Sequence, residues 1–236
     1  MNIAVLIAGG SGQRMNQDIP KQFLSVKDKP IIIYTLEAFE KHPNIDHIAV
    51  VCLDGWHEVL RAYAKQFNIT KLKTITSGGK CGQESIYNGL KALNGIAKEN
   101  DVVLIHDAIR PMVSQDIITD CIVKCQQYGN AVSVIPCNEA MLKSKDDSSA
   151  DISIPRDNLK RTQTPQAVKY GEFVKMHEEA LAMGITSSIA TCTLLIETGK
   201  IVYYSLGSEK NIKLTTVDDL DIFKALLNQK NSGWLK

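Results

Sequence analysis

The sequence has no long apolar run and almost no net charge. Its 236 residues include 27 lysines and arginines and 26 aspartates and glutamates, which leaves a net charge of +1. No apolar stretch approaches the roughly 18 residues of a membrane span, and no charged segment followed by an apolar one opens the chain. Because positive and negative charges nearly balance, the protein as a whole has no electrostatic field that would attract nucleic acid or a membrane surface. We therefore expect a cytoplasmic protein that holds any anionic substrate through local clusters of side chains.

Common motifs for cross-linking, metal binding and hydrolysis are also missing. The six cysteines are scattered without a paired framework, so we expect reduced thiols. Cys121 and Cys125 are four residues apart on a predicted helix, but no second Cys/His pair lies near them to complete a zinc site. The histidines form neither a His-Glu-x-x-His motif nor a Ser-His-Asp arrangement. With 44% hydrophobic residues, the chain can bury one sizeable core.

The N-terminal stretch carries the strongest signal. Residues 3–8 are an apolar run that ends at glycine, which predicts a strand buried on both faces of a parallel sheet. Three glycines follow at Gly9, Gly10 and Gly12. Without Cβ atoms, their backbone N–H groups can approach an anion closely. Two cations come next, Arg14 and Lys21, and such side chains hold phosphate as a two-donor fork and as a mobile point charge. The stretch predicts a polyphosphate site.

Two better-known glycine loops do not fit. A Walker A loop needs Gly-x-x-x-x-Gly-Lys-Ser/Thr, which the chain lacks. A dinucleotide fingerprint would place its third glycine at Met15 and an acidic residue about 20 residues beyond the loop, where residues 30–34 read Pro-Ile-Ile-Ile-Tyr. A nicotinamide dehydrogenase is therefore disfavoured, and NADH fluorescence on mixing would test it. The other alternative is a plain strand-to-helix turn, against which Arg14 and Lys21 count.

Further along, apolar strands alternate with amphipathic helices. We expect strands over 46–53, 72–76, 101–106, 131–136 and 201–206, and helices over 31–41, 58–67, 86–97, 115–128, 169–183 and 220–227. This alternation predicts an α/β fold with a doubly wound, mostly parallel sheet, whose ligands bind beyond the carboxyl ends of the strands. We expect a single domain over 1–236. Within it, residues 137–161 predict two short strands and a polar turn, a projecting β-arm too small to be stable alone.

Two polar segments follow predicted strands and so belong to the ligand edge. Residues 78–85 form a second glycine-containing loop. Asp107 follows the strand over 101–106, and a hard carboxylate oxygen there suits Mg²⁺ bound to a triphosphate. The structural alternatives are a turn at the start of a helix for the loop and a helix-capping role for Asp107.

Five ordered blocks that span almost the whole chain resemble one family. They are Leu6-Ile-Ala-Gly-Gly-x-Gly-x-Arg-Met with Pro20-Lys-Gln-Phe, Gly78-Gly79 with Ser85, Asp107-Ala-x-Arg-Pro, Pro155-Arg-x-x-Leu-x-x-x-Gln-Thr-Pro-Gln, and Asn211-Ile-Lys-Leu-Thr-Thr-Val-Asp-Asp-Leu. Together they resemble the signature of sugar- and polyol-phosphate nucleotidyltransferases, and most of all the cytidylyltransferases of the IspD/TarI family. The resemblance implies a Rossmann-like nucleotidyltransferase fold. It also implies transfer of CMP from CTP to a polyol phosphate, with Mg²⁺ or another divalent cation, and release of pyrophosphate.

The resemblance also implies a role for each matching residue. The catalytic cations are Arg14, Lys21, Arg156 and Lys213. The nucleotide-binding residues are Ile7, Ala8, Gly9, Gly10, Gly12, Gly78, Gly79, Ser85 and Asp107. Asp107 is the metal ligand, and Arg110 and Thr164 bind the acceptor. The arm implies a homodimer, in which Arg156 reaches the acceptor phosphate from one subunit or the other.

The chain departs from the family pattern at two places. Gly82 stands where the family carries an arginine near the nucleotide base, with Lys80 nearby as a candidate replacement. Ile189-Ala190 stands where a Thr-Asp pair is usual, and Ser187 or Thr191 is the candidate replacement. These departures allow a catalytically dead nucleotide-binding scaffold as an alternative, against which the retained cations and Asp107 count.

The acceptor stays open at this point. The favoured one is ribitol 5-phosphate or another wall or capsule polyol phosphate, because Gln163-Thr-Pro-Gln and residues 207–216 look more like that branch. The alternative is 2-C-methyl-D-erythritol 4-phosphate of isoprenoid synthesis.

Overall fold

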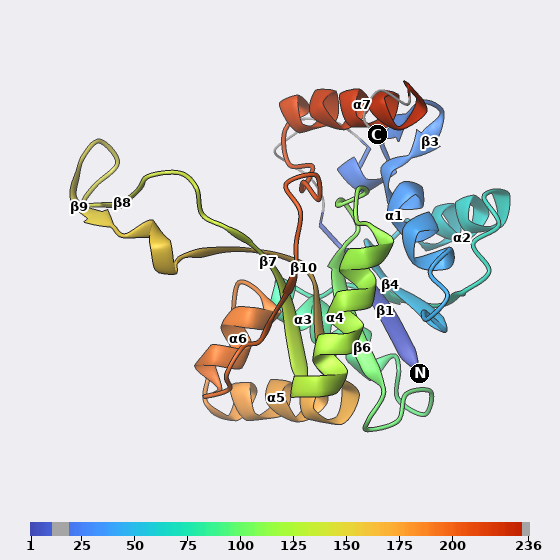
Figure 1. Cartoon of the computed structure of the whole chain (residues 1–236). Helices are drawn as coiled ribbons and strands as arrows, with labels where there is room; N and C mark the ends of the chain where they lie inside the picture. The colour runs from blue at the N-terminus through green and yellow to red at the C-terminus, as the bar shows by residue number, and fades with distance from the viewer. Residues whose placement is uncertain (11–18, 233–236) are drawn as a thin grey trace.

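A seven-stranded sheet forms the centre of the computed structural model, which describes residues 1–10 and 19–232, with side chains up to residue 229 (Figure 1). The strand order is β11-β7-β10-β6-β1-β4-β5. The strands are β1 (Asn2–Ala8), β4 (His47–Cys52), β5 (Leu72–Ser77), β6 (Val102–Asp107), β7 (Asn130–Pro136), β10 (Lys160–Lys169) and β11 (Tyr204–Leu206). β10 runs antiparallel to both neighbours, and the other pairs are parallel. The predicted α/β fold with a mostly parallel sheet is confirmed.

Helices cover both faces of this sheet. On one face lie α1 (Ile31–Glu40), α2 (His57–Gln66) and α4 (Gln115–Tyr128), and on the other α3 (Gly82–Lys91), α5 (Tyr170–Ala182) and α6 (Thr191–Glu197). Strand β1 supplies both cores, because alternate side chains of a strand point to opposite faces. Ala4 and Leu6 pack with the first group and Ile3 and Val5 with the second, all fully buried. This explains why the first strand is an unbroken apolar run.

A third apolar cluster lies beside the sheet. The short strands β2 (Ser25–Val26) and β3 (Lys29–Pro30) pair with each other next to α1. The C-terminal helix α7 (Val217–Ser232) packs there through Phe223, which is fully buried and meets the Tyr34 ring edge-on at 5.2 Å. Thr216 and Asp219 bond each other's backbone N–H groups and so form a capping box at the start of the last helix.

Several elements differ from the sequence prediction. Residues 160–169 form a long strand that the prediction missed, because they are polar and contain a proline. Their backbone groups pair with both β6 and β7, with a shift of register between Thr162 and Gln166, around Pro165, which has no N–H. The helix expected over 86–97 runs over Gly82–Lys91, because Cys81 caps its start. Helix α6 was also not predicted.

The segment between β7 and β10 leaves the body of the molecule (Figure 1). Its strands β8 (Met141–Ser144) and β9 (Ala150–Ile154) pair antiparallel as a hairpin, and almost every residue in them is exposed. The predicted projecting arm is confirmed as a structural feature. Pairing with the main sheet resumes at Lys160, which faces Pro136.

The six cysteines are all free thiols. Burial raises the pKa of Cys52 to about 11 and that of Cys125 to about 12, so both stay protonated at neutral pH. Across residues 1–10 and 19–232, no helix is both long enough and apolar enough to span a lipid bilayer.

Candidate active site

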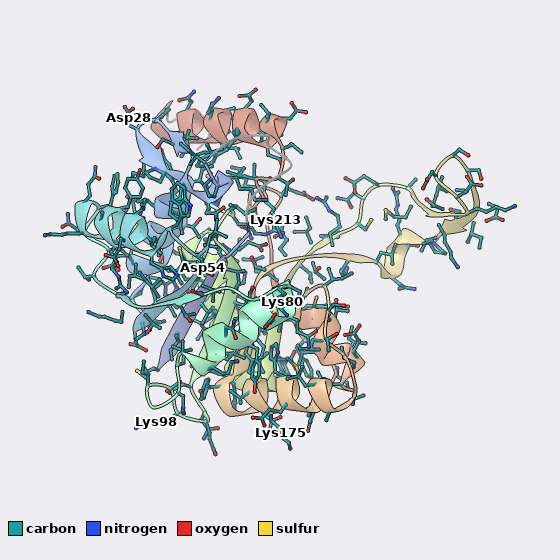
Figure 2. All side chains as sticks on the ribbon, turned by 180° about the vertical axis from the view of Figure 1, so that it is seen from behind. Asp28, Asp54, Lys80, Lys98, Lys175 and Lys213 are labelled. Carbon is teal, nitrogen blue, oxygen red and sulfur yellow. The ribbon has the colours of Figure 1, made fainter. Side chains whose placement is uncertain are left out.

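A cavity of about 370 Å³ opens where β1 and β6 end, at the edge of the sheet where ligands were expected. It brings together side chains from four distant parts of the sequence. The predicted site residues that line it are Ile7, Asp107, Arg110, Thr164 and Lys213. Lys213 lies in the middle of the molecule, near the root of the arm (Figure 2). The long strand β10 is essential to this grouping, because it places Thr164 beside the end of β6.

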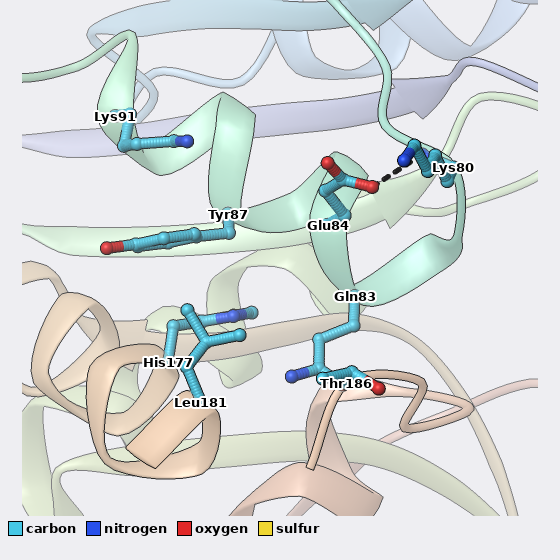
Figure 3. Close-up of a pocket in the computed structure, with 8 residues that line it drawn as sticks. All are labelled: Lys80, Gln83, Glu84, Tyr87, Lys91, His177, Leu181 and Thr186. Atoms are coloured by element: carbon cyan, nitrogen blue, oxygen red, sulfur yellow. Dashed lines mark hydrogen bonds between the residues drawn. The ribbon is translucent and has the colours of Figure 1, made fainter. Parts of the chain in front are cut away.

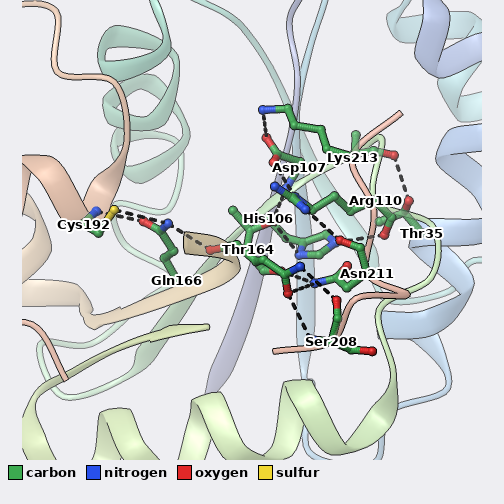
Figure 4. A network of polar contacts seen from close by, with 12 residues as sticks. Thr35, His106, Asp107, Arg110, Thr164, Gln166, Cys192, Ser208, Asn211 and Lys213 are labelled. Carbon is green, nitrogen blue, oxygen red and sulfur yellow. Dashed lines mark hydrogen bonds and ion pairs between the residues drawn. The ribbon is translucent and has the colours of Figure 1, made fainter. Parts of the chain in front are cut away.

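The carboxylate of Asp107 stands between two cations (Figure 4). Arg110 Nε donates to Oδ2 at 2.9 Å, and Lys213 Nζ lies 3.1 Å from Oδ1. Burial by itself would raise the pKa of Asp107, but the charges of Lys213 and Arg110 hold it below its usual value. The carboxylate is therefore ionised at neutral pH, and the three groups together carry a net positive charge that suits a polyanion.

A buried network fixes the position of these cations. Arg110 Nη1 donates to the Asn211 carbonyl at 2.7 Å, and Asn211 Nδ2 donates to the Thr164 carbonyl at 2.8 Å. Gln163 extends the same network, because its carboxamide donates to the Ser208 carbonyl at 2.9 Å and accepts from the Ser208 N–H at 3.1 Å. The segment that carries Lys213 is thus held against β10 by side chains to which the sequence analysis assigned no role.

His106 connects the two sides of this network. Burial lowers its pKa to about 4, so the ring is neutral at physiological pH. Its Nε2 lies 3.2 Å from the Arg110 carbonyl, and its Nδ1 lies 3.1 Å from Thr164 Oγ1. Because a carbonyl only accepts, Nε2 carries the proton and Nδ1 accepts from the Thr164 hydroxyl. That hydroxyl in turn accepts the Asp107 N–H at 3.1 Å, so the neutral histidine holds the loop without adding charge.

The two glycine loops lie against each other beside the cavity. A Cβ on Gly9 would stand 3.4 Å from Gly78 Cα, and one on Gly78 would stand 3.3 Å from Ser85 Oγ. A Cβ on Gly79 would overlap the side chain of Glu84. The Ser85 hydroxyl accepts the Gly79 N–H at 2.9 Å. A side chain at Gly79 would therefore displace Glu84, whereas the two loops themselves are in ordinary van der Waals contact, and Ser85 acts first as an organiser of the second loop.

Gln22 closes the base of the first loop. It is 2% exposed, and its Nε2 donates to the carbonyls of Ala8 at 2.8 Å and Gly10 at 3.0 Å. Its neighbour Lys21 begins the short 3-10 helix Lys21–Phe23, which follows the loop. The predicted residues Gly12 and Arg14 lie outside the described residues. Gln22 was visible in the Pro-Lys-Gln-Phe block, but nothing local showed that it holds two loop carbonyls.

Arg156 is not part of this cavity within one chain. It is exposed, it begins a 3-10 helix (Arg156–Asn158) at the base of the arm, and it donates to the Asn138 carbonyl. Of the three predicted catalytic cations within the described residues, Lys21, Arg156 and Lys213, only Lys213 lines the cavity.

Both departures from the family pattern lie in the cavity wall. Gly82 and Ala190 line it, and a Cβ on Gly82 would meet no atom within 4 Å, so the wall is open there. Thr191 lines the cavity as well, whereas exposed Ser187 does not. Lys80 lines a different cavity. Thr191 is therefore the better placed of the two candidate replacements for the Thr-Asp pair.

Comparison with known proteins gives a consistent result. The chain matches the family model IspD, described as 2-C-methyl-D-erythritol 4-phosphate cytidylyltransferase, over residues 2–229. A ribitol-5-phosphate cytidylyltransferase of Lacticaseibacillus paracasei is 45% identical, covering 98% of this chain and 99% of that protein. A 2-C-methyl-D-erythritol 4-phosphate cytidylyltransferase of Clostridium botulinum is 41% identical, covering 97% and 98%. The 4-diphosphocytidyl-2C-methyl-D-erythritol synthase of Anaerococcus prevotii shares the fold, with a TM-score of 0.80 at 23% identity and 96% coverage of both chains.

Proposed function

This chain belongs to the IspD family of cytidylyltransferases, and we propose that it joins CMP from CTP to ribitol 5-phosphate. The acceptor is supported by the 45% identity to a ribitol-5-phosphate cytidylyltransferase over nearly the full length of both proteins. One observation carries the assignment of the site. The ionised Asp107 lies between Lys213 and Arg110 in a cavity at the carboxyl ends of β1 and β6.

The proposed reaction is an in-line displacement at phosphorus. An oxygen of the acceptor phosphate attacks the α-phosphorus of CTP, the bond to the bridging oxygen breaks, and pyrophosphate leaves. Because negative charge spreads over the equatorial oxygens, the protein has to position two polyanions and neutralise charge, and it needs no covalent nucleophile. The residues that line the cavity suit this chemistry. They include cations, and no activated serine or cysteine occurs among the described lining residues.

Each side of the cavity takes one substrate in this proposal. Ile7, Ala8 and the backbone of Gly9, Gly10 and Gly12 receive the triphosphate, and Gly78, Gly79 and Ser85 receive the ribose and cytosine. Arg14 and Lys21 neutralise the leaving pyrophosphate. Arg110, Thr164 and Lys213 orient the acceptor phosphate, and Lys213, which is 44% exposed, can move from Asp107 to a phosphate oxygen.

The donor set suits a divalent cation that arrives with CTP. No group of three or more His, Cys, Asp or Glu side chains that could hold a metal occurs in the described parts of the chain. Asp107 provides one ionised carboxylate facing the cavity, and Mg²⁺ is commonly held by one or two carboxylates together with substrate phosphates. Asp107 would hold the ion, which neutralises phosphate charge when bound.

The arm supports a homodimer. We propose a single domain over residues 1–236 whose arm, residues 137–161, crosses to a second copy and brings Arg156 to the partner's cavity. The arm exposes Leu142 and Ile152 at 63% and 48%, and a lone hairpin is marginally stable in water. Two copies that exchange arms would bury these side chains. We place the reaction in the cytoplasm, where CTP is made.

Pyrophosphate release measures the proposed function directly. The assay uses the full chain with CTP and Mg²⁺ and compares ribitol 5-phosphate, 2-C-methyl-D-erythritol 4-phosphate and other polyol phosphates. Release with ribitol 5-phosphate alone is the expected result. Release only with the methylerythritol substrate would replace the acceptor and keep the enzyme class, and the 41% identity to the Clostridium botulinum enzyme makes it the second candidate. If no acceptor gives pyrophosphate release while calorimetry shows CTP binding, the acceptor is a different molecule or the protein is a scaffold. Failure to bind CTP would make the Gly82 departure decisive.

A further inference from the structure

A second cavity of about 370 Å³ lies outside the catalytic one, between α3 and α5 (Figure 3). Among the described residues, the two cavities share no lining residue. The outer cavity has an apolar wall formed by Tyr87, His177 and Leu181. The Tyr87 and His177 rings are stacked with centroids 5.2 Å apart and planes 5° apart, and the Leu181 side chain is 48% exposed.

Positive charge lies at the rim of this wall. Lys91 places its ammonium group 4.7 Å from the centroid of the Tyr87 ring, and Lys80 lines the cavity at the start of α3. Glu84 is the one acidic side chain in the lining, and its carboxylate accepts the Lys80 backbone N–H at 2.7 Å. Two ammonium groups against one carboxylate leave the rim with a net positive charge.

The wall also contains a buried polar atom without a partner. His177 is 1% exposed, and its Nε2 has no hydrogen bond in the described structure. Figure 3 shows the imidazole reaching from α5 into the cavity beneath Tyr87. Buried polar atoms are normally hydrogen-bonded, and the exceptions call for an explanation. A bound molecule that offers one hydrogen-bonding group to Nε2 would supply the missing partner.

We propose that the outer cavity is a binding site for a small organic anion with an apolar body and one acidic group. The apolar body would pack against Leu181 and the ring edges, the acidic group would face Lys80 and Lys91, and a polar atom would bond His177 Nε2. The volume is within the range of small-molecule sites, about 300 to 1,000 Å³.

One residue ties this site to the catalytic cavity. Gln83 lines the outer cavity, its Nε2 donates to the Ile185 carbonyl at 2.7 Å, and its Oε1 accepts the Ser188 N–H at 2.7 Å. The segment that it holds continues into Ala190 and Thr191 in the catalytic wall. A narrow void lies between the two cavities, and Gln83, His177 and Thr191 all border it. An occupant that draws Gln83 away from these two hydrogen bonds would alter the wall of the catalytic cavity, and the coupling must be reciprocal.

The binding experiment uses anilinonaphthalene sulfonate, an aromatic monoanion whose fluorescence rises when it is bound. Its readout needs neither activity nor an acceptor, so its failure is distinct from failure of the proposed function. We expect saturable binding of one molecule per chain, and Lys91→Glu and Leu181→Glu should weaken it at least tenfold. Controls are Lys124→Glu, whose lysine lies over Tyr128 on α4 in the same way, and Met183→Glu, which is exposed and does not line the cavity. Equal affinity in the cavity variants and their controls, or no saturable binding, would overturn the site.

CTP titration separates coupling from competition. If the probe occupies the outer cavity, the affinity of the protein for the probe should change about fivefold or more as CTP is added. This affinity should then reach a plateau once CTP saturates the enzyme. Gln83→Met should abolish that change, measured relative to the variant's own probe affinity in the absence of CTP, with the melting temperature as the check on folding. If the apparent affinity for the probe keeps falling as more CTP is added, with no plateau, the probe competes with CTP in the catalytic cavity. This result would overturn the proposal. A plateau unchanged in Gln83→Met would overturn the coupling through Gln83.

Discussion

The two cavities have the same volume, but the buried histidine of each is hydrogen-bonded in a different way. His106 and His177 both have a pKa lowered by burial to about 4, so both rings are neutral. In the catalytic cavity His106 uses both nitrogens, toward the Arg110 carbonyl and the Thr164 hydroxyl. In the outer cavity Nε2 of His177 has no partner among the described residues. The contrast holds for the two histidines only, because Thr191 Oγ1 in the catalytic wall and Asn211 Oδ1 in the adjoining network also have no partner among the described residues.

The largest expected effect is a loss of activity when a lysine of the catalytic site is removed. Comparing this loss with the melting temperature shows whether the lysine acts through its charge or supports the structure. Lys21→Ala and Lys213→Ala should each lower kcat by about a hundredfold or more, because fixed cations that meet developing charge contribute on that scale. The melting temperature should change little, and Lys65→Ala, on the exposed end of α2, is the matched control. Parallel losses of activity and melting temperature would make either lysine a structural residue.

The pH dependence of stability comes next. Between pH 6.5 and about 4, His106 becomes protonated in the unfolded chain but stays neutral in the folded protein. The free energy of unfolding therefore falls as the pH falls. A difference of that size corresponds to about 3 kcal/mol for one histidine. His177 should add a similar effect in the same window. Urea unfolding of His106→Gln and His177→Gln at several pH values would show a shallower slope, and a slope equal to that of the unmodified chain would contradict the burial argument.

The same two histidines should differ when they are replaced by leucine. His106→Leu leaves the Thr164 hydroxyl and the Arg110 carbonyl without their partner, which costs about 1–3 kcal/mol of stability. His177→Leu removes an atom that had no partner, so its cost should be about 1 kcal/mol or less. Denaturant unfolding at neutral pH measures both. Similar losses for the two variants would show that the cavities do not differ as the hydrogen bonds indicate.

Substitutions in the arm should have the smallest effect on the stability of the single chain, but they should clearly weaken the proposed dimer. Leu142→Asp, on the exposed hairpin, should weaken the proposed dimer about tenfold or more, which corresponds to about 1.4 kcal/mol, and should lower activity by removing Arg156 from the partner. Ile201→Asp is a control of similar exposure on the body, 71% against 63%. Sedimentation velocity measures the dimer. An unchanged dimer with Leu142→Asp would exclude this face of the arm from the interface.

Several features of the site followed from the sequence, because local patterns determine them. The buried strand β1 is an unbroken apolar run that leads to glycines, and Asp107 stands at the end of another such run. The order of blocks along the chain indicated the family and its reaction. Helices α1 and α4 lie almost where their periodicity and flanking residues placed them.

The tertiary structure decided what depends on contacts between distant segments. β10 is polar and contains a proline, so only its pairing with β6 and β7 makes it a strand and brings Thr164 beside Asp107. Asn211 shows its role only when its carbonyl meets Arg110 and its side chain meets β10. The separation of Arg156 from its own chain's cavity and the existence of the outer cavity also have no local signature. Periodicity reports which face of an element is buried, but it carries no information about which distant backbone or side chain meets that face.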